Sequence, residues 1–233
     1  MVANVLLDNI KNVFRRISSA AIRSGRSPFD VRLIAVTKTV APERIREAIE
    51  LGLRTFGENK VQEAKEKITT LSPEVRDSEV EWHLIGHLQK NKAKTAVTLF
   101  DVIQSLDSLA LAEELNKYAE KAGKVQRVLF QVKLSDEETK YGVSRDELMT
   151  LISAASDMKN LKPEGLMAIP PFFEDPGRTR PYFKELREIR DRAESAGYAL
   201  PELSMGMTND FEVAILEGAT MVRVGTGIFG ERR

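Results

Sequence analysis

The sequence contains no cysteine and no long apolar run. Without cysteine the protein cannot form disulfide bonds, thiolate metal sites or a cysteine nucleophile, and this composition is typical of a reducing compartment. No apolar segment approaches the roughly 18–20 residues of a membrane-spanning helix. The first residues also lack the basic and then apolar order of a signal peptide. We therefore expect a cytoplasmic protein with no membrane partner.

An excess of one charge is also missing. Lys and Arg number 35, and Asp and Glu number 35, so no overall field favours nucleic acid. Histidine is scarce, with His83 and His87 as the only two. On a helix their spacing would bring the rings together, but here they border a predicted strand end, and two ligands are too few for a protein zinc site. We expect neither a metal nor a nucleic-acid partner.

What the sequence does contain is a repeated alternation of short apolar runs and amphipathic segments. Strands are predicted near 31–36, 53–56, 81–85, 101–105, 125–132, 164–168, 202–204 and 220–224. Helical patterns follow near 42–51, 60–71, 88–98, 108–122, 144–156, 179–196 and 208–217. A first amphipathic helix, over about 2–23, precedes the first strand.

This alternation predicts an α/β fold in which residues 1–233 form a single (β/α)8 TIM-type barrel with an extra N-terminal helix. The length agrees, because such barrels need on the order of 250 residues. A doubly wound open sheet is the alternative fold. It would carry a glycine-rich turn after its first strand, whereas this chain has the glycine-free segment 37–42 there.

Lys38 closes the mostly apolar run 31–38, which predicts a strand buried on both faces. Functional groups of a barrel gather on the loops that follow the strands. An amine at this place has its stem against apolar walls, and burial disfavours its charged form. Lys38 is therefore a candidate Schiff-base former, and the alternative is an ordinary solvated surface lysine.

Two loops near the end of the chain have the composition of a phosphate site. The segment 204–210 brings a hydroxyl and a glycine just before a predicted helix, and 225–227 brings two glycines and a threonine after the last strand. Backbone N–H groups in such loops bind phosphate, and the last two loops of a barrel frequently hold one. The alternative for each glycine is a tight turn that needs a positive φ.

Arg223 interrupts the last apolar strand. A closed barrel has no edge, so a guanidinium in its interior needs a ligand or an acidic partner. An imine-forming amine, an anion cradle and a group at the ring nitrogen are what pyridoxal phosphate (PLP) requires. The residues alone predict a phosphate-binding barrel with a candidate Schiff-base lysine, and they leave open an enzyme that acts on a phosphorylated metabolite without PLP.

Several segments resemble a known family, in order along nearly the whole chain. They are 33–38, 56–63, 82–92, 165–169, 203–210 and 222–230. Together they are similar to the YggS/PROSC family of pyridoxal phosphate homeostasis proteins. That family has the barrel of fold-type III PLP enzymes, similar to the N-terminal domain of alanine racemase.

The resemblance implies a role for each matching residue. Lys38 would form the Schiff base with PLP, and Arg223 would face the pyridine nitrogen. Asn59 and His83 would lie near the ring. The phosphate would be held by Ser204, Gly225 and Thr226, in a loop bordered by Met205 and Gly206.

The resemblance also implies a function without demonstrated turnover, in which the protein binds, carries or buffers PLP in vitamin B6 homeostasis. PLP-dependent apo-enzymes would be the recipients. The residues agree, because arginine does not hand a proton to the ring nitrogen and so leaves PLP a weaker electron sink. Racemisation would also need an acid/base group on each face of the substrate, and nothing places Tyr141 there. We expect no catalytic residue, and a PLP-dependent amino-acid racemase-like enzyme is the alternative.

Overall fold

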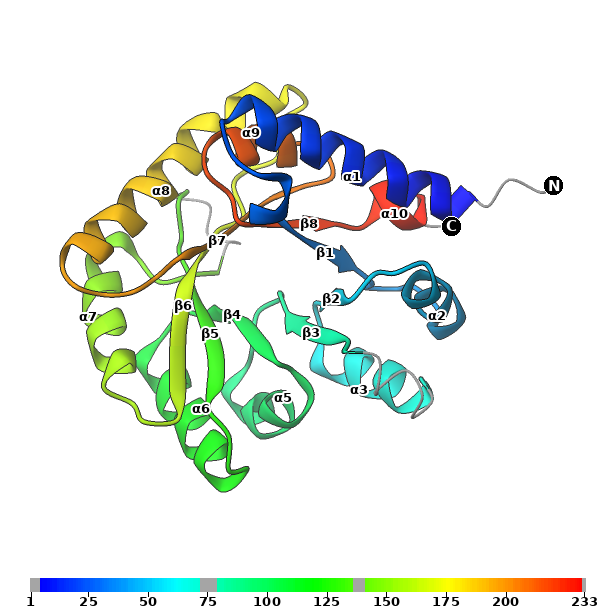
Figure 1. Ribbon diagram of the computed structural model, residues 1–233. Coiled ribbons are helices and arrows are strands. Elements are labelled where there is room, and N and C mark those ends of the chain that lie inside the picture. The colour runs from blue at the N-terminus through cyan, green and yellow to red at the C-terminus, as the bar shows by residue number, and fades with distance from the viewer. Residues whose placement is uncertain (1–4, 72–78, 136–140, 232–233) are drawn as a thin grey trace.

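Eight parallel strands close into a barrel in the computed structural model, which describes residues 5–71, 79–135 and 141–231 (Figure 1). Each strand pairs with the next along the chain, and β1 pairs with β8 to close the barrel. The strands are β1 (Arg32–Val36), β2 (Thr55–Glu58), β3 (Glu81–Leu84), β4 (Val102–Leu106), β5 (Gln126–Gln131), β6 (Leu161–Met167), β7 (Glu202–Met207) and β8 (Met221–Val224). The predicted (β/α)8 barrel is confirmed.

Helices surround the barrel. They are α1 (Val5–Arg23), α2 (Pro42–Glu50), α3 (Val61–Thr70), α5 (Ala93–Leu99), α6 (Leu109–Lys121), α7 (Arg145–Ser156), α8 (Arg180–Ser195), α9 (Phe211–Leu216) and α10 (Thr226–Phe229). Short 3-10 turns occur at Pro28–Asp30, Lys90–Lys92 and Pro176–Thr179. The extra N-terminal helix is α1, which lies beside α9 and α10 (Figure 1). Among the described residues, no helix is long and apolar enough to cross a membrane.

Three strands differ from their predicted bounds by two residues or more. The sixth, β6, begins at Leu161 and not at residue 164. The second strand begins at Thr55 and not at Leu53, because the amide of Leu53 donates to the Ala48 carbonyl and completes the turn that ends α2. The seventh strand extends to Met207, beyond the predicted end at residue 204. It passes through Gly206 with a φ of 90°, a conformation that favours glycine.

Side chains alternate along the strands between two apolar layers. One layer lies between the strands and the helices, and it contains most of the buried apolar residues. The other fills the inside of the barrel with Ile34, Val102, Leu129, Met167 and Met221. This is the packed interior expected of a barrel of this size, so we expect a ligand to bind at an end of the barrel and not inside it.

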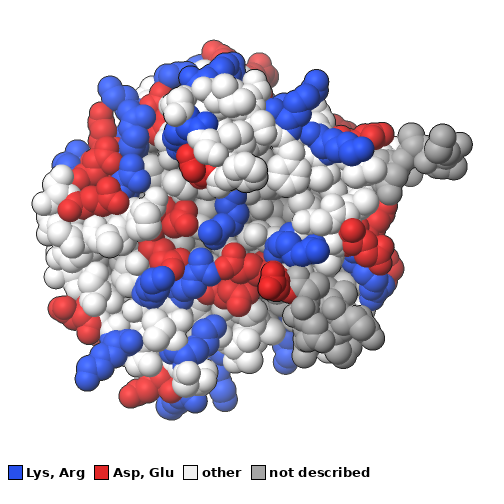
Figure 2. All heavy atoms as spheres, in the orientation of Figure 1, with Lys and Arg blue, Asp and Glu red and all other residues white. Residues whose placement is uncertain are grey.

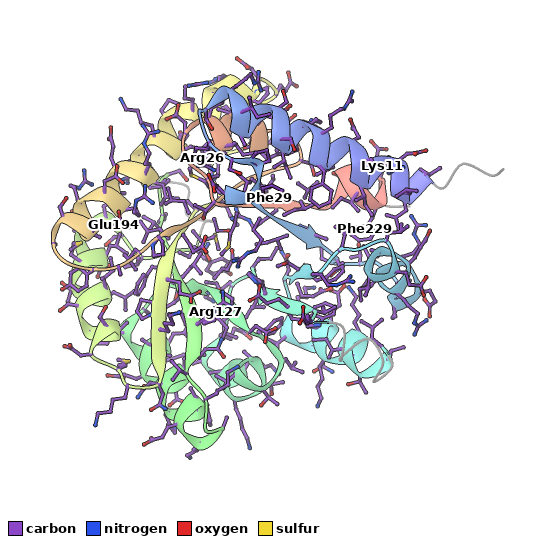
Figure 3. The ribbon with its side chains drawn as sticks, in the orientation of Figure 1. Lys11, Arg26, Phe29, Arg127, Glu194 and Phe229 are labelled. Carbon is purple, nitrogen blue, oxygen red and sulfur yellow. The ribbon has the colours of Figure 1, made fainter. Side chains whose placement is uncertain are left out.

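Charged side chains close the end of the barrel where the strands begin. Arg127, labelled in Figure 3, forms ion pairs with Glu81 and with Glu164. Arg32 lies 3.6 Å from Glu81 and 3.8 Å from Glu202. Acidic and basic side chains are interspersed over the face seen in Figure 2. The apolar and charged layers leave the opposite end, where the strands finish, as the open mouth.

Candidate functional site

Two adjoining cavities, of about 740 and 530 Å³, occupy this mouth. They share the residues Val36, Lys38, Gly225 and Thr226. The larger is also lined by Thr39, Val40, Ala41, Arg44, Phe229, Gly230 and Glu231. The smaller is also lined by Asn59, Ile85, Ile169, Pro171, Phe172, Phe173, Met207, Thr208, Asn209, Asp210 and Arg223.

Lys38 stands where the two cavities meet, two residues after the end of β1. Along β1, Ile34 belongs to the layer inside the barrel and Val36 lines the cavities. Side chains in a strand alternate between faces, and Lys38 continues this inward series. Thr37 is turned the other way, because its hydroxyl donates to Glu58 at 2.7 Å in the layer outside the barrel.

The loops after β7 and β8 meet at two threonine hydroxyls. The Thr226 hydroxyl lies 3.2 Å from that of Thr208, and the amide of Gly227 donates to the same Thr208 oxygen at 3.5 Å. A side chain at Gly225 would approach the Val36 carbonyl to 3.3 Å. Hydroxyls and backbone amides in glycine-containing loops are the donors that cradle phosphate. Here Gly225 and Thr226 border both cavities, and Thr208 borders the smaller one.

Arg223 reaches the smaller cavity from β8 and is only 3% exposed. Its Nη1 donates to the carbonyl and to the hydroxyl of Ser204, both at 2.7 Å, and its Nη2 donates to the Ala168 carbonyl at 2.8 Å. Burial lowers the pKa of Arg223 to about 10, with Asp210 acting in the opposite direction. The guanidinium is therefore charged at neutral pH and held in one orientation.

From Arg223 a chain of hydrogen bonds runs through the barrel interior. The Ser204 hydroxyl donates to Gln104 Oε1 at 2.6 Å. Gln104 Nε2 lies 2.8 Å from His83 Nδ1, and His83 Nε2 lies 3.1 Å from Glu81 Oε2. A hydrogen bond from His83, against the cost of burial, and one from Arg127 lower the pKa of Glu81 to about 2.

The donor and the acceptor in each of these hydrogen bonds follow from the last group of the series, Glu81. The ionised carboxylate of Glu81 only accepts, so His83 carries its proton on Nε2 and accepts on Nδ1 from the Gln104 amide. Burial lowers the pKa of His83 despite the neighbouring Glu81 carboxylate, which keeps the ring neutral. Each group from Arg223 to Glu81 thus donates to the next, and bonds aligned in this way strengthen one another.

Five of the nine residues predicted for the site line the cavities. They are Lys38, Asn59, Arg223, Gly225 and Thr226. Asn59 Oδ1 is buried and accepts no hydrogen bond within the described part of the chain. The backbone of Gly86 packs closely against that of Asn59, because a Cβ on Gly86 would lie 2.2 Å from the Asn59 carbonyl oxygen.

The other four lie outside the cavity linings. His83 and Ser204 are in the barrel interior, within the hydrogen-bonded chain. Met205 packs in the layer between strands and helices, and Gly206 lies against Ala214 and Phe211. The roles predicted for these four residues at the ring and the phosphate stay predictions.

Thr208 and Asn209 line the smaller cavity and were missed from the sequence. The predicted seventh strand ended at residue 204, which placed Ser204 and Met205 at the mouth of the barrel. Because β7 continues to Met207, the first residues beyond the strand are Thr208 and Asn209. The signal that could have found Thr208 is its position between Gly206 and the helix that follows.

Comparison with known proteins agrees with this geometry. The chain matches the family of the alanine racemase N-terminal domain over residues 5–233. It is 46% identical over 227 residues to the pyridoxal phosphate homeostasis protein of Aquifex aeolicus (strain VF5), and the match covers 97% of this chain and 98% of that protein. It is 39% identical to PipY of Synechococcus elongatus PCC7942 in a structure with PLP bound, with a TM-score of 0.81 over 94% of this chain and 100% of PipY.

A more distant likeness concerns the fold alone. Alanine racemase of Clostridium difficile 630 is 14% identical to this chain, with a TM-score of 0.75 over 99% of this chain and 57% of the racemase. The closed barrel and the match over residues 5–233 define a protein of the alanine racemase N-terminal domain class. Within that class, its near-complete match to the Aquifex protein shows that the chain belongs to the family of pyridoxal phosphate homeostasis proteins. The predicted resemblance is confirmed.

Proposed function

We propose that the protein holds PLP as a Schiff base on Lys38 and acts in intracellular vitamin B6 homeostasis. One observation carries this proposal: Lys38 lines a cavity that has paired threonine hydroxyls in one wall and the buried guanidinium of Arg223 in another. When bound, PLP supplies an aldehyde that a lysine amine can capture. The structure of PipY with PLP bound supports the same ligand for this chain.

The residues present fit this cofactor. The smaller cavity, at about 530 Å³, lies in the range of small-molecule sites. Its apolar walls include Ile85 and Ile169, which suit an aromatic ring. The buried oxygen of Asn59 is available to a hydrogen-bond donor of the ligand. We propose that Thr208 joins Gly225 and Thr226 in holding the phosphate.

We further propose that the protein carries PLP and does not catalyse a reaction with it. Arg223 donates hydrogen bonds to Ser204 and to the Ala168 carbonyl, and with a pKa of about 10 it keeps its proton at neutral pH. A guanidinium has donors and no acceptor, so it orients a ring nitrogen without protonating it. The residues thus hold PLP in place and give little help to chemistry on a bound amino acid.

The remaining parts of the proposal concern the setting. We propose that residues 1–233 form one PLP-binding domain, that the protein works in the cytoplasm, and that PLP-dependent apo-enzymes receive its cofactor. The absence of cysteine supports a reducing compartment. Transfer to an apo-enzyme would be seen as recovery of that enzyme's activity when free PLP is kept too low to restore it.

The proposal is tested by adding PLP to apoprotein, following the yellow imine band, reducing with borohydride and mapping the labelled peptide. We expect the label on Lys38, and none in Lys38→Ala. Lys60→Ala, at an exposed lysine nearby, is the matched control and should be labelled at Lys38 like the unmodified protein. A label on another lysine, or no label, would contradict the proposed function.

A further inference from the structure

Three charged side chains hold the backbone on both sides of Lys38. They are Glu58 at the end of β2 and Glu63 and Lys67 on α3, named here the α3 clamp. Lys67 Nζ donates to Glu58 at 2.7 Å, to Glu63 at 2.6 Å and to the carbonyl of Thr37 at 2.5 Å. The clamp therefore reaches the residue that immediately precedes Lys38.

Thr37 is fixed through all of its polar groups. Its amide donates to the Gly57 carbonyl at 3.0 Å, and its hydroxyl donates to Glu58 at 2.7 Å. Its carbonyl accepts from Lys67 and also from the amide of Val40, at 2.9 Å. Thr37 and the Glu58 side chain are fully buried, so water does not replace these partners when one is removed.

Thr39, on the other side of Lys38, has a φ of 63°. This left-handed conformation is an outlier for a β-branched residue, and it persists only where surrounding contacts hold it. The amide of Thr39 donates to Glu63 at 2.5 Å. The clamp thus holds the chain in a turn that the threonine would otherwise leave.

The charge and burial of the clamp indicate a structural task and not a surface role. The Lys67 side chain is 8% exposed, whereas lysines are seldom buried unless paired. Burial raises the pKa of Glu58, although Lys67 and Thr37 donate to it. For Glu63, hydrogen bonds from Lys67 and Thr39 outweigh burial and lower the pKa. Among the described residues that line the two cavities, none belongs to the clamp.

We infer that the α3 clamp positions Lys38 for bond formation with the aldehyde of PLP. The inference rests on the proposed function and assigns part of it to residues that do not touch the cofactor. In the bond-forming step the lysine nitrogen attacks the aldehyde carbon, a C=N bond forms, and the aldehyde oxygen leaves as water with both protons of the neutral amine. The attack needs a defined approach, and a displacement of about 1 Å can slow a positioned reaction by about 100-fold.

The test compares the rate of imine formation in Thr37→Val, Glu63→Ala and Lys67→Met with the rate in the unmodified protein. Thr37→Val removes only the hydroxyl bonded to Glu58, and Glu63→Ala frees the Thr39 amide. We expect each variant to form the imine on the order of ten- to a hundredfold more slowly.

Glu66→Ala and Lys65→Met are matched controls, because both residues lie on the exposed face of the same helix. Both control variants should form the imine at the original rate.

A second ligand separates positioning from damage to the cavity. 4-Deoxypyridoxine 5′-phosphate has the ring and phosphate of PLP but no aldehyde, so it cannot react with Lys38. We expect the clamp variants to bind it with unchanged affinity while imine formation slows. If the clamp variants lose affinity for this analogue by the same factor by which imine formation slows, the whole cavity has moved and the positioning role is wrong.

The result on the unmodified protein distinguishes the two proposals. If the unmodified protein forms the imine on Lys38 and the clamp variants form it equally fast, the clamp inference is wrong and the proposed function stands. If the unmodified protein forms no imine on Lys38, the proposed function is wrong, and so is the clamp inference that rests on it. If Lys67→Met does not fold, the partly exposed Glu63 and the isosteric Thr37→Val still decide the question.

Discussion

Arg223 and Ser204 are joined twice, because Nη1 of the arginine donates to both the carbonyl and the hydroxyl of the serine at 2.7 Å. The Ser204 hydroxyl donates in turn to Gln104, and this series of hydrogen bonds ends on the carboxylate of Glu81 at the other end of the barrel. The cavity at the mouth and the charged layer at the base are therefore parts of one polar network. We therefore expect substitutions at the base of the barrel to change the hydrogen bonds of Arg223.

Replacing Ser204 with alanine should destabilise the fold. The variant leaves Gln104 Oε1 without its donor and removes one acceptor of Arg223, both in a fully buried place. An unsatisfied buried polar group costs about 1–3 kcal/mol, and the free energy of unfolding measured with urea should fall by that amount. The exposed Ser195, whose hydroxyl donates to the Asp191 carbonyl, provides the control, and a Ser195→Ala loss as large as that of Ser204→Ala would refute the argument.

His83 should make stability depend on pH below neutrality. Burial lowers the pKa of this histidine in the folded protein, whereas the unfolded chain has a pKa of about 6.5. The unfolded state therefore binds a proton first as the pH falls, so the stability that His83 contributes is present above about pH 6.5 and is lost below it. Urea denaturation at pH 7.5 and 5.5 should show a smaller difference for His83→Gln than for the unmodified protein. If His87→Gln reduces that difference equally, His83 is not its source.

Glu81 should extend this loss to lower pH. Its pKa in the folded protein is about 2 against an ordinary 4.5, a difference that corresponds to at most about 3 kcal/mol. A carboxyl group with a lowered pKa stabilises the fold above the unfolded value, and that contribution disappears as the pH falls from about 4.5 towards 2. Glu81→Gln should be less stable at pH 7, yet show a flatter decline between pH 5 and 3 by thermal unfolding. An unchanged slope would contradict this account.

The barrel and part of its site could be predicted because they follow from local patterns. Consecutive apolar residues mark strands such as β1, β5 and β8, and Lys38 and Gly225 lie within two residues of the ends of β1 and β8. The end of β7 could not be predicted in this way. Gly206 suggests a turn after Ser204, yet its φ of 90° is used within the strand, where pairing with β8 shifts between Ser204 and Met207.

Contacts between distant segments are the other part that the sequence did not reveal. Ser204 and Gln104 are separated by 100 positions, and no local pattern relates them. Lys67 looks like any lysine on a charged helix, and only the packing of α3 against β2 shows that it is buried beside Glu58. Such residues are identified by their partners, which exist only once the barrel has closed.

Gly86→Ala should disturb the wall of the cavity that contains Asn59. The added Cβ would lie 2.2 Å from the Asn59 carbonyl oxygen and 2.8 Å from its Cα, both backbone atoms that cannot rotate away. Overpacking of this kind typically costs about 1–3 kcal/mol, and PLP affinity, measured by titration of the imine band, should fall with the displaced Asn59. Gly177→Ala meets only the end of the Asp175 side chain, at 3.1 Å, and should change neither quantity by a comparable amount.

Thr208→Val should weaken PLP binding with little change in stability. The hydroxyl of Thr208 lies beside that of Thr226 at the cavity, and valine keeps its shape while removing the polar group. Hydrogen bonds to charged groups contribute about 1.5–3 kcal/mol, so the dissociation constant for PLP should rise by about 10- to 100-fold.

Ser204→Ala is the control for Thr208→Val. If the role of Ser204 is to hold Arg223, this variant should lose more stability and less phosphate affinity than Thr208→Val does. Inorganic phosphate, tested as a competitor of PLP, isolates the anion site from the rest of the cavity. If Ser204→Ala weakens phosphate binding more than Thr208→Val does, the serine predicted from the sequence holds the phosphate and the assignment to Thr208 is wrong.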